Sequence, residues 1–245
     1  MLNTVTYGDA PGPPLLIAHG LFGSARNWGV LAKRLSEARR VVVVDMRNHG
    51  FSEWAATHSY EDMAADLAAV LDAPADVLGH SMGGKAAMVL ALQAPDKVRK
   101  LIVADIAPVT YRHTQMGPIA AMRRVDLTSV TTRAEAKAQL GDLDPGIDDF
   151  LLQNLDLKDK RWRLNLDVLA AEMDKIIGFP DLSGSFDGPT LFLSGEVSTY
   201  VSTDHRGTIK ALFPKAQFAC IPGASHWLHA EKPREFVATV STFLG

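Results

Sequence analysis

Short runs of apolar residues, each bounded by turn-forming residues, recur along the chain and predict β-strands. They are "LLIAHG" (15–20), "VVVVDMRNHG" (41–50), "DVLGHS" (76–81), "KLIVADIAP" (100–108), "PTLFLSGE" (189–196) and "AQFACIPGA" (216–224). Unbroken apolar runs, of which residues 41–44 are the clearest, are typical of strands buried on both faces of a parallel sheet.

Helical patterns lie between these runs. Residues 60–74, "YEDMAADLAAVLDAP", place Met63, Leu67, Val70 and Leu71 on one helical face, and the small-residue helix predicted over "SMGGKAAMVLALQAPDKV" ends before Pro95. Strands that alternate with helices predict right-handed βαβ units, and therefore an α/β fold with a mostly parallel, doubly wound sheet.

The alternation stops after residue 108. Residues 111–178 show only helical patterns, and strand signals resume at "PTLFLSG". A block this long is too large for a simple loop. We expect an inserted segment, residues 109–180, that forms a helical cap on a core made of residues 1–108 and 181–245. A set of extra crossover helices without a lid role is the alternative.

Composition and charge narrow the classes of partner. The chain has 245 residues, 47% of them hydrophobic and 22% charged, which is enough for a large core. A net charge of -3, a pI near 6.2 and scattered basic residues argue against a nucleic-acid partner. No basic leader and no run near ~18 apolar residues is found, so we expect a cytoplasmic protein without a membrane partner. The sequence does not indicate an oligomeric state.

One cysteine, Cys220, lies in the apolar run "AQFACIP". A single cysteine excludes a disulfide within the chain, and its apolar neighbours predict a buried structural thiol.

The stretch "GHSMGGKA", residues 79–86, fits two motifs that exclude each other. As G-x-x-x-x-G-K it approaches a phosphate-binding P-loop, with Asp105 as a possible magnesium ligand. A P-loop needs a Ser or Thr after the lysine, however, and Ala86 follows Lys85. As G-x-S-x-G it is a nucleophile elbow, in which Ser81 occupies a strained turn and flanking glycines leave room for it. The sequence favours the elbow, with Ser81 as nucleophile, and leaves Lys85 without a role.

An elbow of this kind needs donors for a developing oxyanion. Ser81 precedes a helix, so the backbone N–H of Met82 is one candidate donor. "LLIAHGLFGS" is an apolar strand followed by His19 and Gly20, where hydrolases of this architecture place the second donor, here the N–H of Leu21. We expect His19 to brace this loop by hydrogen bonds.

The stretch "IPGASHWLHAEKP", residues 221–233, supplies a general base on a loop after the last predicted strand. His226 can take the proton of a serine there. The competing histidine, His229, lies where the last helix begins. Their H-x-x-H spacing has no third ligand nearby, so we expect no metal and no cofactor.

The third member of a Ser-His-acid triad is ambiguous. The loop "SGEVSTYV", residues 194–201, has Ser198 near the place where many such hydrolases carry the acid. Asp105 ends the strand "KLIVAD" at the carboxyl edge of the sheet, where catalytic groups collect. Asp105 is the favoured acid, and Glu196 and Asp204 are the alternatives.

Taken together, "HGLFGSARNW", "VVVVDMRNHGFS", "LGHSMGGKAAM", "DIAPVTY", "FLLQNL", "RWRLNLDVL" and "PGASHWLHAEKP" resemble the α/β-hydrolase superfamily, most closely the YbfF-type esterases and the abhydrolase-domain-11 proteins. The resemblance spans nearly the whole chain. It implies Ser81 as nucleophile, His226 as base, Asp105 as acid, and Leu21 and Met82 as oxyanion donors. It also implies hydrolysis of short-chain acyl esters, or of acyl thioesters in some members. The chain departs from the family at "SGEVSTYV", which lacks a "GGNS"-like loop.

The resulting prediction is a serine hydrolase that cleaves small, short- to medium-chain carboxylic esters through an acyl-enzyme. Its partners are an ester substrate and water. The alternatives are an acyl thioesterase, a C–C bond hydrolase, and a non-catalytic ligand-binding module. The residues expected to line the pocket are His19, Phe22, His80, Met116, Ile119, Met122 and Trp227. For the residues of the inserted segment the alternative is that they only pack it against the core.

Overall fold

A seven-stranded sheet forms the centre of the computed structural model, which describes residues 1–245. Its strand order is β1-β3-β2-β4-β5-β8-β9. β1 pairs antiparallel with β3, and every other pair is parallel. The strands are β1 (Thr4–Tyr7), β2 (Leu15–Ala18), β3 (Val41–Val44), β4 (Ala75–His80), β5 (Val98–Ala104), β8 (Thr190–Gly195) and β9 (Ala216–Ile221). The predicted mostly parallel sheet is confirmed.

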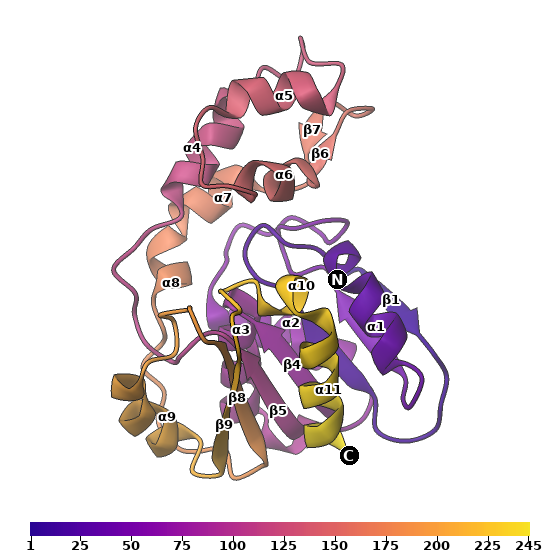
Figure 1. Ribbon diagram of the computed structural model, residues 1–245, viewed down its shortest axis with the longest axis vertical. Helices are drawn as coiled ribbons and strands as arrows, with labels where there is room; N and C mark the ends of the chain where they lie inside the picture. Colours follow the sequence, from indigo (N-terminus) through magenta and orange to yellow (C-terminus); the bar gives the residue numbers. More distant parts are fainter.

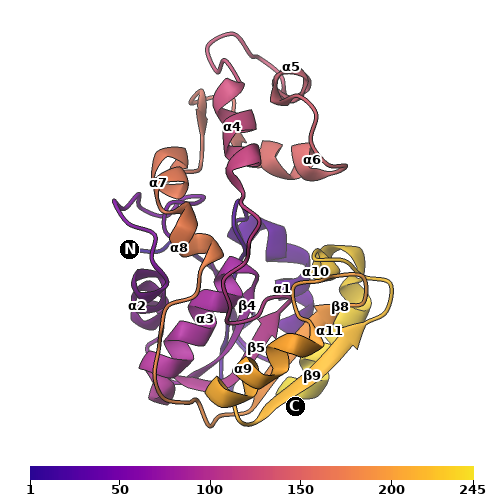
Figure 2. The same cartoon turned by 90° about the vertical axis from the view of Figure 1, so that its left-hand side faces the viewer.

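Helices cover both faces of this sheet, as Figures 1 and 2 show. One face carries α1 (Gly29–Leu35), α10 (Leu228–Glu231) and α11 (Pro233–Leu244), and the other carries α2 (Tyr60–Val70), α3 (Met82–Gln93) and α9 (Arg206–Leu212). Successive strand residues belong to different cores, because side chains alternate between the faces of a strand. Val77 packs toward α2 and α3, and Leu78 packs toward α1 and α11. This double burial explains the unbroken apolar runs.

The two helices predicted on either side of β4 are confirmed. Ser59 caps the start of α2, where its side chain accepts a hydrogen bond from the N–H of Asp62. Met63 and Leu67 are buried on its inner face. α3 begins directly after Ser81 and ends at Gln93, two residues before Pro95. Three short 3₁₀ turns complete the core: Ala25–Trp28, Pro95–Lys97 and Thr203–His205.

The inserted segment lies above the sheet, at the top of Figure 1, and enters and leaves it between β5 and β8. Its helices are α4 (Met116–Arg124), α5 (Arg133–Leu140), α6 (Ile147–Leu152), α7 (Leu166–Ala171) and α8 (Met173–Ile177). A small hairpin of β6 (Leu155–Asp156) and β7 (Arg161–Trp162) also occurs. The expectation of helices alone was therefore wrong, because strands of two residues are too short to show an alternating pattern. The boundaries at residues 108/109 and 180/181 stay a prediction.

Two sets of contacts join the inserted segment to the core. At its base, the N–H of Tyr111 donates to the Ile177 carbonyl at 3.0 Å, so the outgoing and returning chains lie side by side. Near the hairpin, the N–H of Gly50 donates to the Arg163 carbonyl at 2.8 Å. The segment is thus attached at both of its ends along the sheet edge.

Cys220 lies on β9, the last strand of the sheet, and its side chain is exposed. The prediction of a buried thiol was wrong, because an apolar run on an edge strand has one face that neighbouring elements cover only in part. No helix of the chain has both the length and the apolar character that a membrane crossing requires.

Candidate active site

Ser81 stands at the turn between β4 and α3 in a strained backbone conformation. Its φ of 52° and ψ of -120° are rare for a residue with a side chain. The N–H of Ser81 donates to the Ala104 carbonyl of the neighbouring strand at 3.0 Å, which fixes the turn. The predicted nucleophile elbow is therefore the geometry that the chain adopts.

The flanking glycines are required by close backbone contacts. A Cβ on Gly79 would overlap the carbonyl of Gly83, and a Cβ on Gly83 would overlap the carbonyl of Ala18. Neither clash can be relieved by moving a side chain, because the atoms in the way belong to the backbone. This explains why small residues stand two positions before and after Ser81.

Three side chains from different strand ends meet at this turn. The hydroxyl of Ser81 donates to Nε2 of His226 at 3.1 Å, and Nδ1–H of His226 donates to Asp105 at 2.7 Å. Ser81 follows β4, Asp105 follows β5 and His226 lies on the loop after β9. The arrangement matches the hydrogen-bond order of a serine, a base and an acid.

Asp105 is buried and held by further donors. It also has a positive φ, 52°, which turns its side chain at the end of β5. The N–H of Gly195 donates to one carboxylate oxygen at 3.1 Å, and the hydroxyl of Ser198 donates to the other. Ser198, which stands where an acid was expected, therefore supports an acid supplied by another strand.

The two alternative acids lie elsewhere. Glu196 accepts the N–H of Gly223 at 2.7 Å in an exposed position, and Asp204 belongs to the 3₁₀ turn before α9. Neither makes a hydrogen bond to His226, whose Nδ1 contacts Asp105.

Tyr200 covers the imidazole of His226, and the sequence analysis missed it. The two rings stack with centroids 4.1 Å apart and planes inclined by 22°. The hydroxyl of Tyr111 donates to the Tyr200 carbonyl at 2.7 Å, which fixes the loop. An aromatic residue two positions after Ser198 was the available signal. The loop that departs from the family pattern thus packs directly against the base.

The loop after β2 leaves one backbone donor free beside Ser81. The N–H of Phe22 donates to Nε2 of His49 at 3.2 Å, and the N–H of Gly23 donates to the Gly20 carbonyl at 3.0 Å. The N–H of Leu21 makes no hydrogen bond. Met82 is the first residue of α3, so its N–H has no partner within the helix. Both predicted donors are available in the neighbourhood of Ser81.

His19 braces the loop, as expected. Its Nε2 accepts the N–H of Met46 at 2.9 Å, and its Nδ1–H donates to the Gly20 carbonyl at 2.8 Å. An imidazole that accepts a hydrogen bond must be neutral. Burial, which disfavours the charged ring, lowers the pKa of His19 in agreement with this role.

Several other histidines are buried as neutral rings. Burial lowers the pKa of His58 to about 3 and that of His229 to about 3, and it also lowers the pKa values of His49 and His80. His229 lies against Trp28, with ring centroids 4.5 Å apart and nearly parallel planes, and its Nδ1 has no hydrogen-bond partner. No group of three or more His, Cys, Asp and Glu side chains is arranged to hold a metal ion.

These histidines make the fold sensitive to acid. Between their native pKa and about 6.5 the unfolded chain binds protons that the native chain does not, so stability falls as pH drops through this range. His58 and His229 together are expected to lower the free energy of unfolding by about 2.5 kcal/mol from about pH 7 to about pH 5.5. Urea unfolding at the two pH values measures this. Replacing His229 by phenylalanine, which keeps a ring against Trp28, should reduce the loss, and equal stability at both pH values would contradict the assignment.

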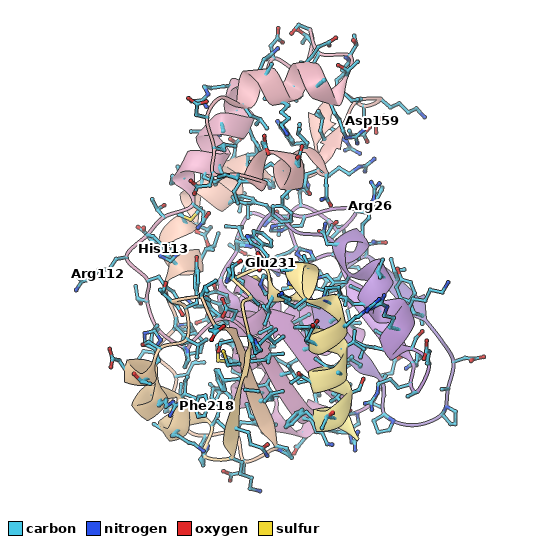
Figure 3. All side chains as sticks on the ribbon, in the orientation of Figure 1. Arg26, Arg112, His113, Asp159, Phe218 and Glu231 are labelled. Carbon is cyan, nitrogen blue, oxygen red and sulfur yellow. The ribbon has the colours of Figure 1, made fainter.

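A cavity of about 460 Å³ opens beside Ser81 and His226, between the sheet and the inserted segment. Of its 29 lining residues, 15 are hydrophobic, so it suits an apolar group that carries one polar centre. Figure 3 shows the side chains that fill this region, with His113 on the connection that leads to the inserted segment. Nε2 of His113 and the hydroxyl of Tyr200 are hydrogen-bonded at 2.7 Å.

The predicted pocket residues divide into two groups. The lining includes His19, Phe22, His80 and Trp227, as well as Leu21 and Met82. It does not include Met116, Ile119 and Met122. Ile119 and Met122 are fully buried in the packing of α4, and Met116, at its start, is 36% exposed. The helix α6 supplies the apolar wall instead, through Ile147, Phe150 and Leu151.

Lys85 joins the elbow helix to the base of the inserted segment. Its side chain is buried, and its Nζ donates to the carbonyls of Ile177 (2.9 Å) and Gly178 at the end of α8. It also lies 4.8 Å from the centre of the Tyr111 ring. Burial lowers the pKa of Lys85 to about 7. A cation at a helix C-terminus offsets the unpaired carbonyls. The sequence offered no signal for this role, because the partners are more than ninety residues away.

A sequence model described as "Alpha/beta hydrolase family" matches residues 15–239. With the elbow and the parallel sheet in place, the chain belongs to the α/β-hydrolase family, as the sequence motifs predicted.

Three similar proteins define its neighbourhood within that family. The chain is 45% identical to a Mus musculus protein named sn-1-specific diacylglycerol lipase ABHD11, over 97% of this chain and 82% of that protein. It is 40% identical to the esterase YbfF of Escherichia coli strain K12, over 94% of this chain and 92% of that protein. A solved structure titled "Marine microorganism esterase" is 39% identical and superposes with a TM-score of 0.94, covering 99% of this chain and 98% of the other. The predicted resemblance to YbfF-type and abhydrolase-domain-11 proteins is confirmed.

Proposed function

We propose that this chain is a serine esterase that hydrolyses small carboxylic esters with short- to medium-chain acyl groups. The observation that carries the proposal is the continuous hydrogen-bonded chain from Ser81 through His226 to Asp105, at 3.1 and 2.7 Å, beside a mainly apolar cavity. The names of the relatives, an esterase and a diacylglycerol lipase, support an ester as the substrate class.

Acylation follows from this geometry. The Oγ of Ser81 attacks the acyl carbonyl carbon while Nε2 of His226 accepts the hydroxyl proton. The carbonyl oxygen becomes an oxyanion, and the N–H groups of Leu21 and Met82 donate to it. When the tetrahedral intermediate collapses, the bond to the alcohol oxygen breaks and His226 gives the proton to that oxygen. Asp105 keeps Nδ1 protonated and stabilises the imidazolium.

Deacylation repeats these steps with water as the nucleophile. His226 takes a proton from the water, whose oxygen attacks the acyl carbon, and returns the proton to Oγ of Ser81 as the acid leaves. No cofactor enters the scheme. The inserted segment acts in this proposal as a cap whose α6 side chains contact the acyl chain. A cytoplasmic location stays a prediction.

The substrate class is tested with p-nitrophenyl esters that range from acetate to palmitate. Each added methylene gains about 0.8 kcal/mol of binding while the cavity accepts it, so kcat/KM should rise to a maximum among short and medium chains. It should then fall at least about tenfold for palmitate, which exceeds the cavity. Thioesters with the same acyl groups, measured in parallel, decide between esterase and thioesterase. Folded protein that hydrolyses none of the series faster than its Ser81→Ala variant would refute the proposal.

A further inference from the structure

Phe22 is a strained residue in the loop that carries the free Leu21 N–H. Its φ is 61°, in the region that residues with a side chain rarely adopt. Its position is 5% exposed, beside the cavity. Backbone strain at a functional site persists only when its surroundings hold it in place. Two buried polar side chains, from two distant parts of the chain, do so here.

The first of these side chains, Asn154, comes from the inserted segment. It lies between α6 and β6, is 4% exposed, and donates from Nδ2 to the Phe22 carbonyl at 2.8 Å. Both oxygens near its amide nitrogen, of Phe22 and Leu151, are carbonyls, so only an NH₂ group fits there. The Asn154 carbonyl accepts the N–H of Arg163 at 2.9 Å. The donor is therefore fixed by the inserted segment's own backbone.

The second side chain, His49, comes from the loop after β3. Its Nε2 accepts the N–H of Phe22 at 3.2 Å, while its Nδ1–H donates to the Arg47 carbonyl at 2.8 Å. It is fully buried, and burial lowers its pKa well below the ordinary value, which keeps the ring neutral and able to accept. A backbone bridge to Leu164 ties His49 to the inserted segment as well.

We propose that Asn154 and His49 are positioning residues for the oxyanion hole. They hold the peptide groups on both sides of Phe22, so that the adjacent Leu21 N–H remains unpaired and directed at the Ser81 site. If Phe22 relaxed to a negative φ, the Leu21–Phe22 peptide would turn and displace that donor. This inference rests on the proposed esterase function, and it makes the inserted segment part of the catalytic centre as well as its roof.

The closest test is an isosteric exchange of one amide. Asn154→Asp keeps the shape of the side chain but replaces the donor with a carboxylate that repels the Phe22 carbonyl. Asn165→Asp is the matched control: Asn165 also joins the inserted segment to the core, by donating to the side chain of Asn48 at 3.1 Å, and does not contact Phe22. Misplacing a donor is expected to lower kcat of Asn154→Asp about 10- to 100-fold with KM nearly unchanged. Asn165→Asp should stay within about threefold of wild type.

A second readout separates positioning from loss of stability. An alkyl boronic acid adds to the serine and places an oxygen in the oxyanion hole, so its affinity should fall in parallel with kcat/KM for Asn154→Asp. Melting temperatures of the two variants show whether stability alone explains the change. If Asn154→Asp does not fold, Asn154→Ala and His49→Gln carry the same test, since glutamine can still accept the Phe22 N–H and should retain more activity than His49→Leu.

The outcomes distinguish this inference from the function on which it rests. An active wild type with an equally active Asn154→Asp variant, or with unchanged boronic acid affinity, would overturn the positioning role and leave the esterase intact. A folded wild type without esterase activity would overturn the proposed function itself.

Discussion

Replacing Ser81 by alanine is expected to lower kcat for a short-chain ester by about 10⁵- to 10⁶-fold. The variant keeps the cavity and the backbone donors but has no atom that can form the acyl-enzyme. Since His226 and Asp105 act only through Ser81, their catalytic contributions disappear with it. Steady-state hydrolysis of p-nitrophenyl butyrate, with the spontaneous rate subtracted, measures the loss.

Ser241→Ala is the control for this exchange. Ser241 lies exposed on α11, remote from the elbow, and its side chain makes no hydrogen bond. It should stay within about twofold of wild type. A Ser81→Ala protein with more than about a tenth of wild-type kcat would show that another group is the nucleophile.

Asp105→Asn is expected to lower kcat by about 10⁴-fold. Asparagine can still accept from Gly195 and Ser198, so the turn at the end of β5 should survive. Its NH₂ group, however, faces Nδ1 of His226 and favours the tautomer with the proton on Nε2. That tautomer cannot accept the proton of Ser81. The melting temperature should change little compared with the loss of rate.

The matching exchange at the alternative acid is Glu196→Gln. Glu196 contacts the N–H of Gly223 and not His226, so this variant should retain kcat within about threefold of wild type. Loss of activity in Glu196→Gln together with a nearly active Asp105→Asn variant would reverse the assignment of the acid.

The elbow could be predicted from the sequence because its constraints are local. Gly79 and Gly83 clash only with backbone within or beside the turn, and the spacing of the three residues repeats that geometry in the sequence. His226 could be placed because its loop follows a strand with a strong apolar signal. The parallel sheet followed from the same runs.

Features set by contacts between distant segments could not be predicted. The pairing of Lys85 with the end of α8 and that of Asn154 with Phe22 join residues about ninety or more positions apart. Helical periodicity marks Ile119 and Met122 as apolar, but it does not tell whether the apolar face meets the cavity or the other helices of the inserted segment. Ser198 shows the same limit: its absence of charge was visible, and its donation to Asp105 was not.

The central claim, that Ser81 is an activated nucleophile, is tested most directly by labelling with a fluorophosphonate. Native wild-type protein is incubated with the reagent, digested, and mapped by tandem mass spectrometry, with Ser81→Ala and heat-unfolded protein alongside. We predict one adduct per chain, on Ser81, that is absent in both controls because activation needs the serine and the folded arrangement with His226. Folded wild-type protein that stays unlabelled, or that carries the adduct on another residue, would contradict the claim.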